Sequence, residues 1–123
     1  MYFGSEDMVV YSIDGAGKQR WVFNASSGVY ASPAVAGGSS QGAAGTVYVG
    51  SDGGSVFELD AQTGAMAWEF KTGGAVYSTP ALQFCSRRKS NRSSSSRSSS
   101  DHPCAIFFGS SDGTMYSLDL ASF

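Results

Sequence analysis

The chain has 123 residues and a formal charge of −2; 41% of its residues are hydrophobic, 13% are aromatic and 16 are glycine. This length can bury one modest core but is too short for a large multidomain enzyme, and no apolar run approaches the roughly 18 residues that a membrane helix needs. Five of the eight basic residues lie within residues 83–103, so the rest of the chain is acidic and disfavours a nucleic-acid surface. We therefore expect no membrane partner and no nucleic-acid partner.

Three stretches of fourteen residues align without a gap, and each predicts a β-hairpin. They read MYFGSEDMVVYSID at 1–14, VYVGSDGGSVFELD at 47–60 and IFFGSSDGTMYSLD at 106–119. In each stretch an apolar triplet is followed by Gly-Ser, a short acidic or glycine turn and a run of alternating polarity, which is typical of half-buried strands joined by a tight turn. The alternation places the following side chains on one face of their strands: Tyr11 and Ile13, Phe57 and Leu59, and Tyr116 and Leu118.

A second block recurs twice at an offset of 47 residues. It runs from Trp21 to Val35 and again from Trp68 to Leu82, and it contains a tryptophan-bearing strand and a Ser/Thr-Pro-Ala segment. Turn sequences that contain Asp and Gly separate this block from the preceding hairpin. One complete unit therefore holds four short strands, at residues 32–35, 47–50, 56–60 and 67–70.

Four antiparallel strands in about 47 residues make one blade of a β-propeller, which must stack on neighbouring blades to bury its faces. The predicted fold is all-β: a β-propeller fragment of about 2.5 four-stranded antiparallel blades. Residues 1–31 form a partial blade, residues 32–77 a full blade, and residues 78–123 a partial blade with an insert at 85–104. Closed propellers need four to eight blades, so we expect a fragment, the product of a truncated gene model, or a self-associating piece. Its predicted partners are the remaining blades of its own propeller, another protein, or a second copy.

The stretch at 47–70, VYVGSDGGSVFELDAQTGAMAWEF, resembles the pyrroloquinoline-quinone-like (PQQ-like, or quinoprotein) repeat family. The resemblance covers nearly all of the chain apart from 36–45 and 83–104, and it implies the propeller fold of the quinoprotein alcohol dehydrogenases. The family usually has alanine two residues before the Asp that ends the third strand. This chain has other residues there: Ser12, Glu58 and Ser117.

In the resembled family, the tryptophan of each outer strand docks on the neighbouring blade, against a turn that carries Thr-Gly. The resemblance implies that Trp68, with Thr63 and Gly64, forms this tryptophan-docking element. It implies the same role for Trp21, whose turn is one residue shorter and carries Gly17. Both tryptophans are therefore expected to be structural.

The insert between residues 85 and 104 is a low-complexity segment rich in Ser and Arg. It has no apolar periodicity, which predicts a disordered loop between adjacent strands. A phosphorylation or RNA-contact role stays open beside the commoner solvated loop. Cys85 and Cys104 flank the insert at the facing ends of two strands that are predicted to pair, so they form either a disulfide or two independent thiols.

The sequence shows no catalytic, cofactor-binding or metal site. Its one histidine, His102, lies within the predicted insert, where it is a poor general base for a catalytic triad, and two cysteines with one nearby histidine match no zinc spacing. Three aspartates, Asp14, Asp60 and Asp119, recur at the same strand end. Such recurrence at one structural position favours turn capping over paired-carboxylate catalysis.

Quinone-dependent dehydrogenases of the resembled superfamily hold the quinone and a calcium ion in a central funnel whose site includes two adjacent cysteines, and this sequence has no adjacent pair. The first functional hypothesis is therefore a non-catalytic propeller that serves as a binding platform, scaffold or accessory domain. This hypothesis includes the propeller appended to acyl-activating enzymes of the aminoadipate-semialdehyde dehydrogenase type, and outer-membrane assembly factors of similar fold. The alternative is a fragment of a quinone- and calcium-dependent alcohol or sugar dehydrogenase, and this alternative alone implies pyrroloquinoline quinone and calcium as cofactors.

Overall fold

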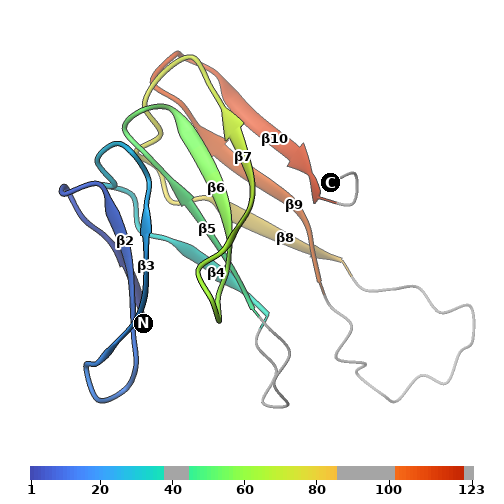
Figure 1. Cartoon of the computed structure of the whole chain (residues 1–123). Helices are drawn as coiled ribbons and strands as arrows, with labels where there is room; N and C mark the ends of the chain where they lie inside the picture. Colours follow the sequence, from blue (N-terminus) through green and yellow to red (C-terminus); the bar gives the residue numbers. More distant parts are fainter. Residues whose placement is uncertain (38–44, 86–101, 121–123) are drawn as a thin grey trace, which may run out of the picture.

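The structure is a computed structural model that describes residues 1–37, 45–85 and 102–120. These residues form ten β-strands, which lie side by side in three sheets (Figure 1). The strands are β1 (Tyr2–Gly4), β2 (Val9–Ile13), β3 (Gln19–Asn24), β4 (Ala34–Ala36), β5 (Thr46–Gly50), β6 (Ser55–Asp60), β7 (Met66–Lys71), β8 (Ala81–Cys85), β9 (His102–Gly109) and β10 (Met115–Asp119). The predicted all-β fold class is confirmed.

Each sheet is an antiparallel meander, in which strands that follow one another in the sequence are neighbours. The first sheet has the order β1-β2-β3, the second β4-β5-β6-β7 and the third β10-β9-β8. The three aligned stretches form the hairpins β1-β2, β5-β6 and β9-β10, as predicted. Strands β4 and β8 touch one another, so they mark the inner side of the array, and β3 and β7 lie on its outer side (Figure 1). Sheets stacked in this order are the blades of a partial β-propeller.

Two hydrophobic clusters hold the sheets together, one at each interface. The first cluster joins the first and second sheets, and the second cluster joins the second and third sheets. The second sheet packs on both faces: Val49 and Leu59 belong to the first cluster, whereas Tyr48 and Val56 belong to the second, as the period-two alternation of a strand requires. The inner strand β4 contributes small side chains such as Ala36, and the outer strands contribute aromatic ones.

The buried face of the first sheet differs in part from the prediction. In β2, Val10 and Ser12 are fully buried, whereas Tyr11 and Ile13 are only half-buried. The side chains at the positions of Tyr11 and Ile13 face the preceding sheet in the second and third blades, and the described residues place no sheet before the first. The alternation is therefore confirmed, but the side that becomes buried depends on the neighbouring blade.

The paired strands reach further into the predicted insert than its composition suggested. Strand β8 extends to Cys85, and β9 already begins at His102. The ladder between them shifts register after Gln83 and then continues through the pairs Phe84–Pro103 and Cys85–His102. Backbone pairing therefore includes residues that lack an apolar pattern, and the central part of the predicted insert, residues 86–101, lies outside the described residues.

Ser12 is a buried polar residue at a position where the family usually has alanine. It is fully buried, and its hydroxyl has no hydrogen-bond partner in the described part of the chain. A buried hydroxyl without a partner costs about 1–3 kcal/mol, so we expect Ser12→Ala to raise the free energy of unfolding by about 1 kcal/mol, measured by urea denaturation. Ser117→Ala is the matched control, because Ser117 is the exposed equivalent and should change stability little. A destabilising Ser12→Ala would show that the hydroxyl is satisfied.

Candidate functional site

The best-defined contact between two sheets is the site where the Trp21 side chain packs against the turn after β6, here named the socket of Trp21. Its indole is 7% exposed, and Nε1–H donates a hydrogen bond of 2.9 Å to the carbonyl oxygen of Ala61, in the turn after β6. The Tyr2 hydroxyl donates to the same oxygen at 3.2 Å, and the Tyr2 and Trp21 rings lie 5.7 Å apart. Gly64, at φ +77°, closes the turn, and a Cβ built on it would lie 2.6 Å from the indole. The socket therefore needs glycine both for its backbone conformation and for space.

The partner of the Gly64 turn differs from the expectation. The resemblance associated this turn with Trp68, but Trp68 lies on β7 of the same sheet, is half-buried and packs against the second cluster. Docking instead runs across the interface, from the outer strand of one sheet to the turn of the next sheet. Thr63 shapes that turn, since its Oγ1 accepts a hydrogen bond from the Ala65 N–H at 3.2 Å. A Cβ on Gly17, in the equivalent turn of the first sheet, would meet nothing within 4 Å.

The recurring aspartates lie at the ends of equivalent strands, and two of them, Asp14 and Asp60, support the turns that follow. The Asp14 carboxylate accepts hydrogen bonds from the Ala16 and Lys18 N–H groups, both at 2.9 Å. The Asp60 carboxylate caps its turn in the same way, with donors at 2.7 and 3.1 Å. Asp119 ends β10 at the equivalent position. The three carboxylates lie on separate sheets, and the local backbone partners of Asp14 and Asp60 give these two a structural role.

Tyrosine–carboxylate pairs occupy the opposite end of the sheets, where the turns of the three hairpins meet the loops after β3 and β7 (Figure 1). The Tyr11 hydroxyl donates to Asp7 and the Tyr116 hydroxyl to Asp112, each at 2.6 Å. The bond from Tyr116 is the main cause that lowers the pKa of Asp112 to about 2, and backbone N–H groups add to it. One of these is the N–H of Gly73, 3.0 Å away, which ties the third sheet to the loop after the second.

Asp112 should contribute to the way in which the free energy of unfolding depends on pH in acid. The folded-state pKa of its carboxyl is lowered from 3.8 to about 2, so the carboxylate stabilises the fold above its unfolded pKa, and this contribution is lost as the pH falls toward 2. We expect Asp112→Asn to lower the free energy of unfolding at about pH 5 and to make much less difference at about pH 2. Urea denaturation at both pH values measures this, and an equal difference at both would contradict it.

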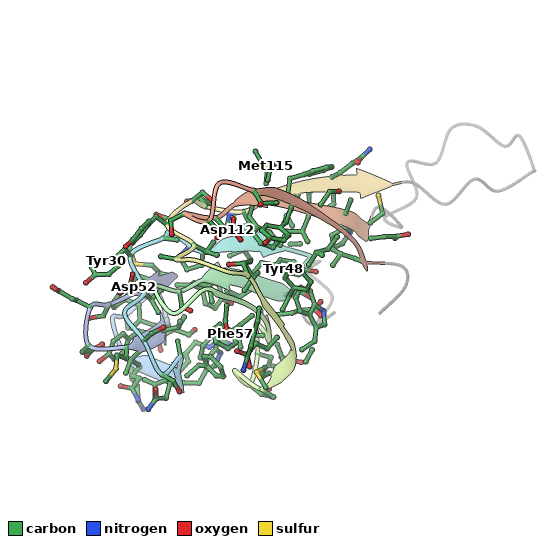
Figure 2. The ribbon with its side chains drawn as sticks, turned by 90° about the horizontal axis from the view of Figure 1, so that it is seen from above. Tyr30, Tyr48, Asp52, Phe57, Asp112 and Met115 are labelled. Carbon is green, nitrogen blue, oxygen red and sulfur yellow. The ribbon has the colours of Figure 1, made fainter. Side chains whose placement is uncertain are left out.

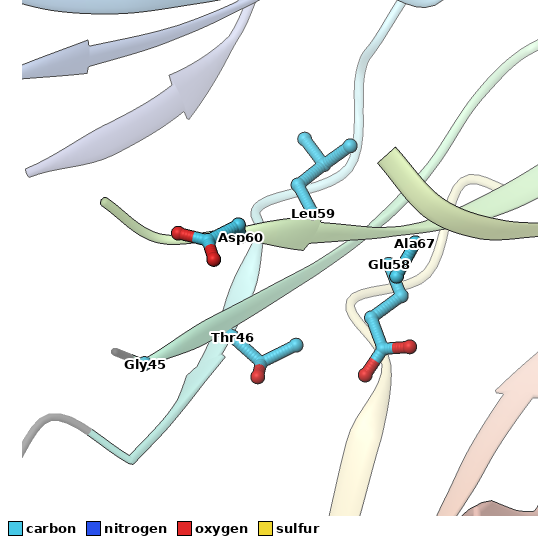
Figure 3. A pocket seen from close by; sticks show the side chains of 6 residues that line it. All are labelled: Gly45, Thr46, Glu58, Leu59, Asp60 and Ala67. Carbon is cyan, nitrogen blue, oxygen red and sulfur yellow. The ribbon is translucent and has the colours of Figure 1, made fainter. Parts of the chain in front are cut away.

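A small open pocket of about 150 Å³ lies beside the second sheet. Its lining residues are Gly45, Thr46, Glu58, Leu59, Asp60 and Ala67 (Figure 3). Ligand sites usually enclose about 300–1,000 Å³, and the acidic groups of this pocket have partners already. The Glu58 carboxylate accepts a hydrogen bond of 3.0 Å from the Tyr48 hydroxyl, and burial together with Glu58 raises the pKa of that phenol.

The described residues contain no group of three or more His, Cys, Asp or Glu side chains that could hold a metal ion. In the same part of the chain no helix is long and apolar enough to cross a membrane. Cys104, on β9, is disulfide-bonded, and Cys85 ends the paired strand β8. The side chains of Cys85 and His102 lie outside the described residues, so the Cys85–Cys104 pairing stays a prediction.

Sequence reasoning missed two further tyrosines, which lie at the same end of the sheets as the tyrosine–carboxylate pairs. Tyr30 and Tyr77 stand at the 47-residue offset of the repeat, and the structure places their rings 6.0 Å apart. That offset was the signal that could have found them, because equivalent loop positions of adjacent blades lie side by side.

A family model described as outer membrane protein assembly factor BamB, of the PQQ-repeat type, matches residues 6–84. Among solved structures, the chain is similar to the crystal structure of BamB from Moraxella catarrhalis, with a TM-score of 0.64 and 18% sequence identity. This similarity covers 98% of the chain and 29% of the BamB chain, so the chain spans less than a third of that relative, and it concerns the fold alone. No curated protein matches the chain significantly in sequence.

Proposed function

Because the chain belongs to the BamB-like family of PQQ-repeat β-propeller proteins, we propose that it acts as a non-catalytic binding or scaffold unit. The observation that carries the proposal is the state of its two outward sheet faces. Val10 and Val56, at one position of the repeat, are fully buried between sheets, whereas the equivalent Met115 is 73% exposed. At another position, Val49 is fully buried and Phe3 is 39% exposed. The outward faces are thus the two halves of the interface that already joins the three sheets.

Such faces fit further blades of the same repeat, supplied by the same polypeptide or by another chain. An interface whose two different halves are displayed on one molecule is heterologous, and it joins molecules head to tail. The carboxylates support the non-catalytic part of the proposal, because the hydrogen bonds described above use them to cap turns or to bind tyrosine hydroxyls.

The association of the full chain tests the proposal. We expect a concentration-dependent increase in mass by analytical ultracentrifugation, and a shift toward the monomer for Met115→Lys, because the substitution places a charge in the joint. Met66→Lys is the matched control, since Met66 is an exposed methionine of the second sheet, whose two faces are both covered. A wild-type chain that stays monomeric, or equal effects of the two substitutions, would contradict the proposal.

Two settings for this unit have separate tests. A role as the accessory propeller of an acyl-activating enzyme of the aminoadipate-semialdehyde dehydrogenase type would appear in the full-length transcript as an adjoining domain. The alternative, a part of a quinone- and calcium-dependent dehydrogenase, predicts calcium-dependent quinone absorbance and dye reduction when the chain is titrated with pyrroloquinoline quinone. We expect neither the quinone absorbance nor the dye reduction.

A further inference from the structure

One end of the first two sheets displays a pair of exposed tyrosines framed by carboxylates, here named the tyrosine ladder: Glu6, Tyr30, Asp52 and Tyr77. The Tyr30 hydroxyl donates to Glu6 at 3.3 Å and the Tyr77 hydroxyl to Asp52 at 2.9 Å. The two rings lie 6.0 Å apart and are tilted by 53°. Figure 2 shows Tyr30 and Asp52 close together on this end, with Asp112 further along it.

The tyrosine rings are held in place but do little to hold the fold together. Tyr30 is 54% and Tyr77 57% exposed, and neither belongs to a hydrophobic cluster. The loops that carry the ladder are tied to each other across the sheet interface, since the Asp52 N–H donates to the Gly28 carbonyl oxygen at 2.7 Å and the Gly53 N–H to Ser27 Oγ at 2.8 Å. Two large aromatic side chains are therefore fixed with much of their surface open to a partner.

The loops at this end carry acidic charge, and one cation, Lys71, lies beside them as the last residue of β7. The turns and loops at 5–8, 25–33, 51–54, 72–80 and 110–114 contain four acidic residues and no Lys, Arg or His. Glu6 and Asp52 raise the pKa of the Tyr30 phenol, so the phenol stays neutral. A negatively charged surface with exposed aromatic faces repels anionic partners and attracts cations.

We propose that the tyrosine ladder binds an extended segment of a protein partner through an arginine or lysine side chain, whose cation lies over a tyrosine ring and beside a carboxylate. Cations are attracted to the faces of aromatic rings, and tyrosine is enriched in protein interfaces because it offers a large contact area at small entropic cost. Arginine fits better than lysine, since its planar guanidinium stacks on the ring and bridges to a carboxylate. The proposal rests on the proposed function as a binding unit and names its partner class.

Fluorescence anisotropy of a labelled hexa-arginine peptide with the full chain tests the ladder. We expect Tyr30→Ala together with Tyr77→Ala to weaken binding about tenfold, because each exposed cation–π contact contributes a factor of about three. Tyr30→Phe with Tyr77→Phe keeps the rings and should stay within about twofold of the wild type. Asp52→Asn should weaken binding more than Asp14→Asn, which removes the same charge at the opposite end of the sheets.

The outcomes that would overturn the inference are distinct. Equal losses for Asp52→Asn and Asp14→Asn, with no loss for the double alanine variant, would mean attraction by net charge alone. Absence of peptide binding, or equally strong binding of a hexaglutamate peptide, would also overturn it. A calcium-dependent quinone titration of the same preparation separates this failure from that of the proposed function, because quinone binding would contradict the non-catalytic scaffold, whereas a loss of peptide binding would leave it standing.

Discussion

Replacing Trp21 by alanine is expected to lower the free energy of unfolding by about 3–5 kcal/mol. The substitution empties a buried indole site at the joint between two sheets and removes the hydrogen bond to the Ala61 carbonyl oxygen. It also leaves a gap over Gly64, whose turn packs directly against the ring. Urea denaturation of the full chain measures the change, read as a lower midpoint at constant slope.

Two companion variants locate the origin of that loss. Val22→Ala alters the adjacent residue of β3, which is 47% exposed, and should cost less than about 1 kcal/mol. Trp68→Ala should fall between the two, since Trp68 is half-buried. If Trp21→Ala lowers the free energy of unfolding no more than Val22→Ala does, the packing of the indole against the Gly64 turn does not stabilise the fold.

Replacing Gly50 by alanine is expected to destabilise the fold by about 1–3 kcal/mol or more through overpacking. A Cβ on Gly50 would lie 2.4 Å from Val76 Cγ1 and 2.9 Å from Val76 Cβ. Val76 is fully buried, so its side chain cannot move aside without disturbing the second cluster. Glycine is thus required here by a close approach between a hairpin and the loop after β7.

Gly109 provides an unusually close control for Gly50. It occupies the same position of the third repeat, but a Cβ there would meet nothing within 4 Å. Gly109→Ala should therefore leave stability unchanged or raise it by about 0.4–1 kcal/mol, because alanine restricts the unfolded chain. Equal effects of the two substitutions would show that backbone conformation, and not packing, requires these glycines.

Most of the fold could be predicted from the sequence, because the sequence contains three aligned copies of the same hairpin. Aligned copies identify the hairpins, and the position of Trp21 and Trp68 in the repeat identifies the outer strands. The copies could not show which turn receives Trp21, because that contact joins residues of two different blades. The burial of Ser12 could not be predicted for a related reason. The alternation of a strand defines its two faces, but which face is buried depends on where the neighbouring sheet lies.

The candidate binding surface was harder to predict than the fold. Its tyrosines and carboxylates lie on separate loops, so Tyr30 and Glu6, 24 residues apart in the chain, meet only when the blade has formed. Local periodicity carries no information on such loops, since their backbones are neither helical nor paired. The same limit explains the strand ends at Cys85 and His102, where backbone pairing continues beyond the apolar pattern.

The uneven sizes of the side chains between the sheets set the curvature of the whole array. At the interface of the second and third sheets, the inner strand β4 contributes Ala34 and Ala36, whereas the outer strand β7 contributes Trp68 and Phe70. The gap between sheets therefore widens outward, which makes each blade a wedge, and the repeated wedge angle determines how many blades complete a circle. Larger residues in place of the inner alanines would reduce that angle and favour a wider ring, so the number of blades is encoded in side-chain volumes along the inner and outer strands.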